Sequence, residues 1–205
     1  MPTAGGGHIH CTKARAPRYV RGVAAPTIRA AEQSDVPKLA ELAKRTWSSA
    51  FGDGVTPEDE AAELEQTRSE GYFLDALRTK TILVAERDGT LLGYVQFGEV
   101  DIPDVHAQPG DRGLHRLYVD TASQGRGLGR RLAEAALRHP RLAAASRIFL
   151  QVWDENARAV RLYESLGFRK IGTTTFTVGS QVMEDLVMVL ERGETARQPS
   201  ERAPT

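Results

Sequence analysis

The sequence predicts a single α/β domain built around a mixed β-sheet, and three observations support this prediction. Helical and strand-like patterns alternate from about residue 27 to residue 190. A glycine-rich turn at residues 124–129 joins an apolar strand-like run to an amphipathic helical stretch. The chain has 205 residues and a hydrophobic content of 40%, which suffices for one sizeable core and is short for two domains.

The predicted strands are runs of aliphatic, aromatic and β-branched residues bounded by turn formers. They cover residues 27–31, 81–86, 91–98, 114–120, 147–153, 168–177 and 183–190. Asp88-Gly89 predicts a tight hairpin between the second and third strands, because both residues tolerate a left-handed backbone. Residues 178–180 form the last predicted turn, and residues 102–113, which include two prolines, are expected to form a loop.

The predicted helices carry apolar residues three or four positions apart. The first follows the N-cap candidates Ser34 and Asp35 and stops at residues 51–54. The others cover residues 57–78, with an interruption at Gly71, residues 127–139 and residues 157–166. Gly167 follows the last helix, at the position where a left-handed glycine ends many helices.

Both ends of the chain depart from this pattern. Residues 1–25 are rich in Gly, Ala, Pro and Arg, and the first acidic residue is Glu32, which predicts a disordered basic arm. Residues 193–205 are polar and predict a disordered tail. The folded domain is therefore expected to span residues 26–192.

Composition argues against several classes of function. The 27 basic and 27 acidic residues give a formal net charge of zero, so neither nucleic acid nor a membrane is a predicted partner. The chain has no run of about 18 apolar residues, and its start lacks the apolar segment of a secretory signal, which together predict a cytoplasmic protein. Cys11 alone cannot form an intramolecular disulfide or a cysteine zinc cluster, and no metal is predicted.

The glycine-rich turn predicts a binding site for a phosphorylated ligand. The first N–H groups of a helix lack internal partners, and the helix dipole makes that end positive. Glycines let an anion approach these groups closely. Arg126, Arg130 and Arg131 crowd the same end, where cations oppose the dipole unless an anion is bound.

Two common phosphate-binding folds fit this turn poorly. A dinucleotide-binding turn follows the first strand directly and has a third glycine where this chain has Arg130. Here the turn comes past mid-chain, five residues beyond its apolar strand. The phosphate loop of nucleotide hydrolases requires Gly-Lys-Ser/Thr, which does not follow the turn.

Two motifs in order resemble the GCN5-related N-acetyltransferase (GNAT) family. The family's Gln/Arg-x-x-Gly-x-Gly/Ala loop matches Gln124, Gly127 and Gly129, after a strand that ends in Leu117-Tyr118-Val119. Its next motif, a strand, an asparagine and a tyrosine-bearing helix that ends in Gly-Phe, matches residues 148–168. The resemblance covers roughly residues 27–191 and is strongest at 114–170.

This resemblance implies a GNAT-like domain whose central, mostly antiparallel sheet is splayed at an acetyl-CoA site and flanked by helices. Acetyl-CoA would be a cosubstrate, and an amine would attack it directly in a ternary complex. The pyrophosphate would accept hydrogen bonds from the turn, and the pantetheine arm would lie along the preceding strand. The implied cofactor-binding residues are Leu117, Tyr118, Val119, Gln124, Gly125, Arg126, Gly127, Leu128, Gly129, Arg130 and Asn156.

The resemblance also assigns the catalytic acid, whereas the base stays open. Tyr163 would protonate the leaving thiolate, although its apolar helical stripe alone favours a core tyrosine. Asn156 could cap the same helix as well as contact the ligand. His115 stands where many relatives have a glutamate and is the predicted base, with a structural histidine as the alternative. Glu99 and Asp101 are further candidates.

The acceptor is predicted to be a small polyamine-like primary amine. An acidic segment supports this, with eight carboxylates against Arg68 between residues 53 and 75. The segment and the chain's ending also resemble PaiA-like spermidine/spermine acetyltransferases. Gln151 replaces the glutamate of ribosomal-protein acetyltransferases, which disfavours the alternative of a protein N-terminal or lysine acetyltransferase. A non-catalytic acyl-CoA-binding module is the third hypothesis, and a homodimer stays open.

Overall fold

The computed structural model describes residues 24–51, 55–103 and 105–192. The predicted disordered arm, apart from its last two residues, and the predicted tail lie outside these ranges, as do Cys11 and the Gly52-Asp53-Gly54 break. The described residues form one α/β unit around a single sheet, as the sequence predicted.

The sheet has seven strands in the order β1-β2-β3-β4-β5-β7-β6. All neighbours are antiparallel except β4 and β5, which are parallel. The strands are β1 Thr27–Ala30, β2 Thr81–Arg87, β3 Thr90–Gly98, β4 Arg112–Val119, β5 Arg147–Trp153, β6 Arg169–Val178 and β7 Gln181–Glu191. The sheet is therefore mostly antiparallel, and its one parallel junction lies at its centre.

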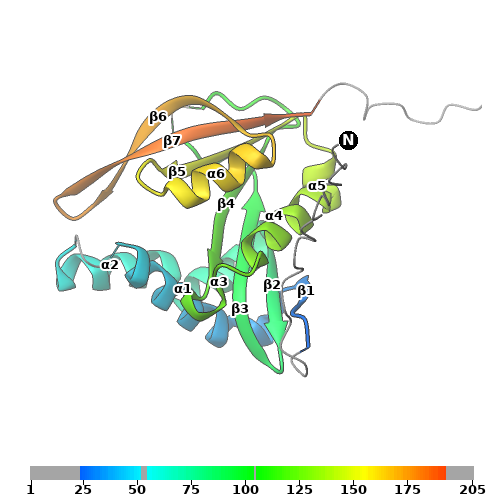
Figure 1. Ribbon diagram of the computed structural model, residues 1–205. Helices are drawn as coiled ribbons and strands as arrows, with labels where there is room; N and C mark the ends of the chain where they lie inside the picture. Colours follow the sequence, from blue (N-terminus) through cyan, green and yellow to red (C-terminus); the bar gives the residue numbers. More distant parts are fainter. Residues whose placement is uncertain (1–23, 52–54, 104, 193–205) are drawn as a thin grey trace, which may run out of the picture.

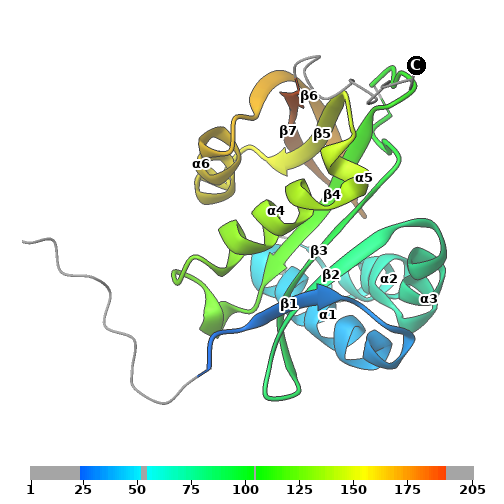
Figure 2. The same cartoon turned by 90° about the vertical axis from the view of Figure 1, so that its right-hand side faces the viewer.

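Helices flank the sheet on both faces. They are η1 Gln33–Asp35, α1 Val36–Phe51, α2 Pro57–Arg68, α3 Glu70–Thr79, η3 Thr121–Ser123, α4 Leu128–Arg138, α5 Pro140–Ala143 and α6 Ala157–Ser165. Figure 2 shows α4 on one face of β2–β4, with α1 and α3 on the other. Alternate strand residues supply the two cores: Leu83 packs on the α4 side and Val84 on the α1 side.

Two helical predictions need correction. The helical region 57–78 is interrupted at Ser69 and not at Gly71, which lies inside α3. Ser69 takes an extended backbone, and its hydroxyl accepts a hydrogen bond from the Tyr72 N–H, so it ends α2 and caps α3. The sequence reading also missed the short helix α5, which has Pro140 at its first position.

The strands β4 and β5 pair only where they begin. Arg112 lies opposite Ile148 and Gly113 opposite Phe149, after which the two strands diverge. Figure 1 shows the result: β5, β7 and β6 lean away from β2, β3 and β4. A buried ion pair lies at this junction, because Asp111 accepts hydrogen bonds from the Arg147 guanidinium at 3.1 and 2.5 Å.

A bulge in β4 sets the direction of its side chains. Gln96 of β3 faces Arg116, whereas the next residue, Phe97, faces Leu114. His115 is thus the extra residue on β4. The bulge interrupts the alternation of side chains along the predicted strand 114–120, and β4 begins two residues earlier than predicted.

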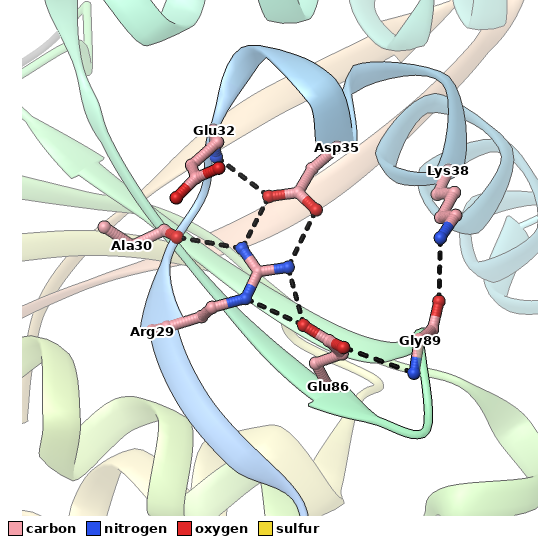
Figure 3. A network of polar contacts seen from close by, with 7 residues as sticks. All are labelled: Arg29, Ala30, Glu32, Asp35, Lys38, Glu86 and Gly89. Carbon is pink, nitrogen blue, oxygen red and sulfur yellow. Dashed lines mark hydrogen bonds and ion pairs between the residues drawn. The ribbon is translucent and has the colours of Figure 1, made fainter.

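One polar network holds the first strand against the start of α1. The Arg29 guanidinium binds Asp35 at 2.6 and 2.8 Å and Glu86 of β2 at 2.8 Å (Figure 3). Asp35 also accepts a hydrogen bond from the Glu32 N–H, so it closes the turn that precedes α1. The hydrogen bonds from Arg29 hold the pKa of the Asp35 carboxyl below its ordinary value despite its burial.

Candidate active site

A cavity of about 820 Å³ lies where β4 and β5 diverge. It extends from the start of α4, past the facing edges of β4 and β5, to α1 and α2. Every predicted site residue except Arg126 lines it. The divergence therefore gathers residues from positions 115 to 163 around one hollow.

The exposed edge of β4 forms one wall of the cavity. Val95 and Tyr94 of β3 occupy the other edge, opposite Leu117 and Tyr118. Beyond Gly113, β4 has no partner in β5, so its backbone groups on that side face the cavity. Such an edge can accept an extended amide-bearing chain as an added strand.

The glycine turn provides an uncapped helix start. Gly125 and Gly127 have φ of 76° and 77°, a left-handed backbone that favours glycine. Gly127 is the N-cap of α4 and has no side chain to occupy the first N–H groups of the helix. A Cβ on either glycine would meet open space, so the ligand side of the turn is clear. This arrangement binds anions.

The arginines around the turn differ from the expectation. Arg130 lines the cavity and donates to the Ser165 hydroxyl at 2.6 Å. Arg131 instead donates to the Pro26 carbonyl, and Arg126 is exposed outside the cavity lining. Arg158, which the sequence reading missed, lines the cavity from α6.

Two amide side chains tie the turn to its neighbours. Gln124 donates to the Val119 carbonyl at 3.1 Å and accepts from Arg158 at 2.9 Å. Asn156 accepts from the Ala159 N–H at 3.0 Å and so caps α6. Its side-chain NH₂ group is a donor that the cap does not use, so a cap and a ligand contact are compatible.

Tyr163 lies on α6 where that helix faces both the core and the cavity. The residue is only 6% exposed and packs edge-on against Phe168, with ring centroids 5.8 Å apart. Burial raises the pKa of the Tyr163 hydroxyl above its ordinary value. The hydroxyl therefore keeps its proton at neutral pH and can donate it.

His115 has the geometry of a positioned, neutral histidine. Its Nε2 lies 2.7 Å from the Glu99 carbonyl oxygen, which can only accept, so Nε2 carries the proton. Gly113 makes this approach possible, because a Cβ there would lie 2.6 Å from Nε2. Burial and the Lys80 charge lower the pKa of His115 to about 4. The other nitrogen, Nδ1, is buried with no hydrogen-bond partner among the described residues.

The other candidate bases are placed unequally. Glu99 lies outside the cavity lining and forms ion pairs with Arg112 and Arg141, both at 3.3 Å. Asp101 lines the cavity beside Lys80, at 3.3 Å. Gln151 also lines the cavity, but an amide cannot take a proton.

The sequence reading missed Asp185 of β7, which lines the cavity on the side formed by β5–β7. It lies opposite Trp153 in the sheet. Burial, with a smaller effect of Asp154, raises the pKa of Asp185 to about 6. It belongs to the chain's ending that resembles PaiA-like enzymes, but that resemblance gave it no role in the site.

Aromatic rings from both halves of the protein meet beside this cavity. Phe51 of α1 lies with its ring centroid 5.5 Å from Trp47 and 5.5 Å from Trp153 of β5. All three line the cavity. Such rings form an apolar wall that also attracts cations.

Two negative findings hold for the described ranges. No group of three or more His, Cys, Asp or Glu side chains there could hold a metal ion. No helix within them is long and apolar enough to cross a membrane.

Comparisons with known proteins agree on one family. The model of the acetyltransferase (GNAT) family matches residues 36–168. An uncharacterized N-acetyltransferase of Mycobacterium tuberculosis (strain ATCC 25618 / H37Rv) is 34% identical over 165 residues, which cover 77% of this chain and 98% of the relative. A spermine/spermidine N(1)-acetyltransferase of Bacillus subtilis is 33% identical over 97 residues, which cover 47% of this chain and 63% of the relative.

Solved structures share the fold. The PaiA N-acetyltransferase from Thermoplasma acidophilum, determined in complex with coenzyme A, superposes with a TM-score of 0.64. The match covers 82% of this chain and 100% of that protein, at 17% sequence identity. The splayed sheet is thus an arrangement found in a protein that binds coenzyme A.

Proposed function

The chain belongs to the acetyltransferase (GNAT) family and is an acetyl-CoA-dependent N-acetyltransferase, and from this premise we propose that its acceptor is a small primary amine that attacks the thioester directly. The observation that carries the proposal is the divergence of β4 from β5, which opens one cavity. A helix start lies at one end of it, and aromatic rings and the Asp185 carboxylate lie elsewhere on its lining. The helix start suits a diphosphate, and the rings and the carboxylate suit an amine.

In this proposal, acetyl-CoA is held mainly by backbone groups. The pyrophosphate accepts from the N–H groups of residues 125–130, including those of Leu128 and Gly129, and Arg130 adds charge. The pantetheine arm lies along the free edge of Leu117, Tyr118 and Val119. The uncapped turn and the unpaired edge support this placement.

The proton donor in this proposal is Tyr163. The amine nitrogen attacks the thioester carbonyl carbon, the carbon–sulfur bond breaks, and Tyr163 gives its proton to the departing sulfur. The hydroxyl suits this step because it stays protonated and borders the cavity. No enzyme nucleophile is needed, because the amine is itself the nucleophile.

The proton acceptor that the geometry favours is Asp185 and not His115. The accepting nitrogen of His115 is buried, and its pKa of about 4 makes it a weak base. Asp185 borders the cavity, and its carboxylate forms no ion pair within the described residues. With a pKa of about 6 it is ionised at neutral pH, so it can hold the ammonium group and accept its proton directly or through water.

A small acceptor fits the cavity better than a protein chain does. Asp59 of α2 lies against Gly179 in the β6–β7 turn, where a Cβ on the glycine would overlap the carboxylate. Figure 1 shows the tip of this hairpin pointing toward α2. Because Glu63 of α2 and Phe176 of β6 line the cavity, this contact joins two elements that border it, which supports a free amine over a lysine on a folded protein.

The polyamine prediction gains less support from the structure than from the relatives. Of the acidic residues expected to draw a polycation, only Glu63 lines the cavity within the described part of that segment, and it is paired with Arg68 at 2.7 Å. Glu58, Glu65 and Glu70 are exposed to solvent. Spermidine is therefore one acceptor to be compared with others of different charge.

Thiol release from acetyl-CoA tests the proposal directly. The purified protein would be assayed with spermidine, with small amino acids and their amides, with a peptide bearing a free N-terminus and with a lysine peptide. We expect kcat/KM for the best small amine to exceed that for either peptide by at least about tenfold. Acetylation of the peptides alone would overturn the small-acceptor proposal.

A further inference from the structure

Two arginines, one on α2 and one on β4, border the same cavity as Asp185. Arg68, at the end of α2, has a side chain only 5% exposed, and its guanidinium lies 5.1 Å from the Trp47 ring centroid. Arg116 of β4 lies 4.4 Å from the Tyr72 ring centroid and donates to the Thr67 carbonyl at 2.6 Å. Both arginines line the acceptor side of the cavity.

The positive charge of this wall exceeds its negative charge. Glu63 pairs with Arg68 at 2.7 Å. Arg116 contacts a neutral carbonyl and an aromatic face, and no carboxylate within the described ranges forms an ion pair with it. A half-buried cation without a counterion is unfavourable, so a negatively charged group bound beside Arg116 would be stabilised.

The same wall also has buried donors that lack acceptors. Arg68 Nε and Trp47 Nε1 are both buried without a hydrogen-bond partner among the described residues. Each of these groups can only donate. Buried donors without acceptors are rare in folded proteins. Two such donors on the lining of one cavity indicate that a ligand supplies the acceptor.

We propose that Arg68, Arg116 and Trp47 bind an anionic group carried by the acceptor itself. Guanidinium and indole N–H groups match the oxygens of a carboxylate, and two guanidiniums match a phosphonate equally well. The inference rests on the proposed function, in which Asp185, which borders the same cavity, holds the amine. The acceptor class is then a small zwitterion, a primary amine that also bears a carboxylate or a phosphonate, and not a polycation.

The first test compares matched acceptors on the wild-type protein. Each amino acid is paired with its amide, which keeps the amine and the side chain and removes the negative charge, and with its aminophosphonate counterpart. We expect kcat/KM for the acid to exceed that for the amide by at least about tenfold. The ratio of carboxylate to phosphonate then identifies which anion the wall prefers.

The second test removes the unbalanced charge. In Arg116→Gln, KM for the acids should rise about tenfold or more, while the amides keep their KM and acetyl-CoA its affinity. Arg116→Lys keeps the charge and should restore part of the loss. Arg78→Gln, an exposed arginine on α3 that lies outside this cavity, is the matched control and should change neither series.

The outcomes separate this inference from the proposed function. Equal rates for acids and amides, an equal effect of Arg116→Gln on both series, or a preference for spermidine over every zwitterion would overturn the anion site and leave the N-acetyltransferase of small amines intact. Thermal melting and calorimetric acetyl-CoA binding confirm that each variant is folded. If Arg116→Gln does not fold, the acid–amide comparison and Arg116→Lys decide the matter.

Discussion

Replacing Tyr163 by phenylalanine removes one hydroxyl and leaves the ring that packs against Phe168. The side chain is almost fully buried, and the ring keeps its apolar contacts, so we expect the free energy of unfolding to change by less than about 0.5 kcal/mol. Losing the general acid should lower turnover about ten- to a thousand-fold. That range corresponds to about 1.4 to 4 kcal/mol in the activation barrier.

The assay is thiol release at saturating acetyl-CoA and acceptor, with acetyl-CoA affinity measured separately by calorimetry. Affinity should be unchanged, because the proposed cosubstrate contacts come from β4, the glycine turn and Asn156. Tyr94→Phe is the control: it removes a buried hydroxyl that has no hydrogen-bond partner among the described residues and lies outside the cavity lining. Turnover of Tyr163→Phe within about twofold of the wild type would remove Tyr163 from the mechanism.

Three further predictions address stability, the cosubstrate and the amine. Asp35→Asn should lower the free energy of unfolding by about 1–3 kcal/mol at pH 7, because it weakens charged hydrogen bonds to Arg29. Since the pKa of Asp35 is lowered in the folded state, this stabilisation is present above about pH 4 and is lost as the pH falls further. Urea titrations should therefore show that the difference in free energy of unfolding between wild type and variant decreases below that pH. Gly127→Ala forces a left-handed alanine and should lower the free energy of unfolding by about 1–2 kcal/mol. Calorimetry should also show that coenzyme A binds about tenfold more weakly or worse. The control Gly172→Ala, at a glycine with an ordinary φ and open space around it, should change neither stability nor binding. With Asp185 ionised, the acceptor's kcat/KM should rise as the pH passes through about 6, and Asp185→Asn should abolish that step; a step that survives in the variant belongs to another group.

Much of the fold could be predicted because its signals are local. The hairpin at Asp88-Gly89 has positive φ at both residues, which agrees with the prediction from the two residue types. Gly167 has φ of 93° and ends α6, again from its own residue type. The helix break was predicted at Gly71 because glycine is a poor helix former. It lies at Ser69 instead, because the Ser69 hydroxyl caps the next helix.

The residues predicted to bind the cosubstrate lie close together in the structure, because they follow one another within β4, the turn and α6. Other residues that line the cavity could not be grouped from the sequence. Trp47, Arg68 and Asp185 belong to α1, α2 and β7, and their local sequences do not indicate that they line one cavity. Their common feature, the cavity that they line, arises only when β7 and α2 are brought together across the splayed sheet.

By itself, the sequence determined the order of helices and strands, the glycine-rich turn before α4 and the family, since hydrophobic period, turn chemistry and motif spacing are all properties of short stretches. The tertiary structure alone decided that His115, at a bulge, lies against the Glu99 carbonyl and that Arg131 donates to the Pro26 carbonyl. It also decided that Arg68, Arg116 and Asp185 line one cavity. The physical reason is that the burial, the ion pairs and the pKa of a side chain depend on the residues packed around it. Whether a group is neutral, paired or available depends on neighbours that lie tens of residues away in the chain.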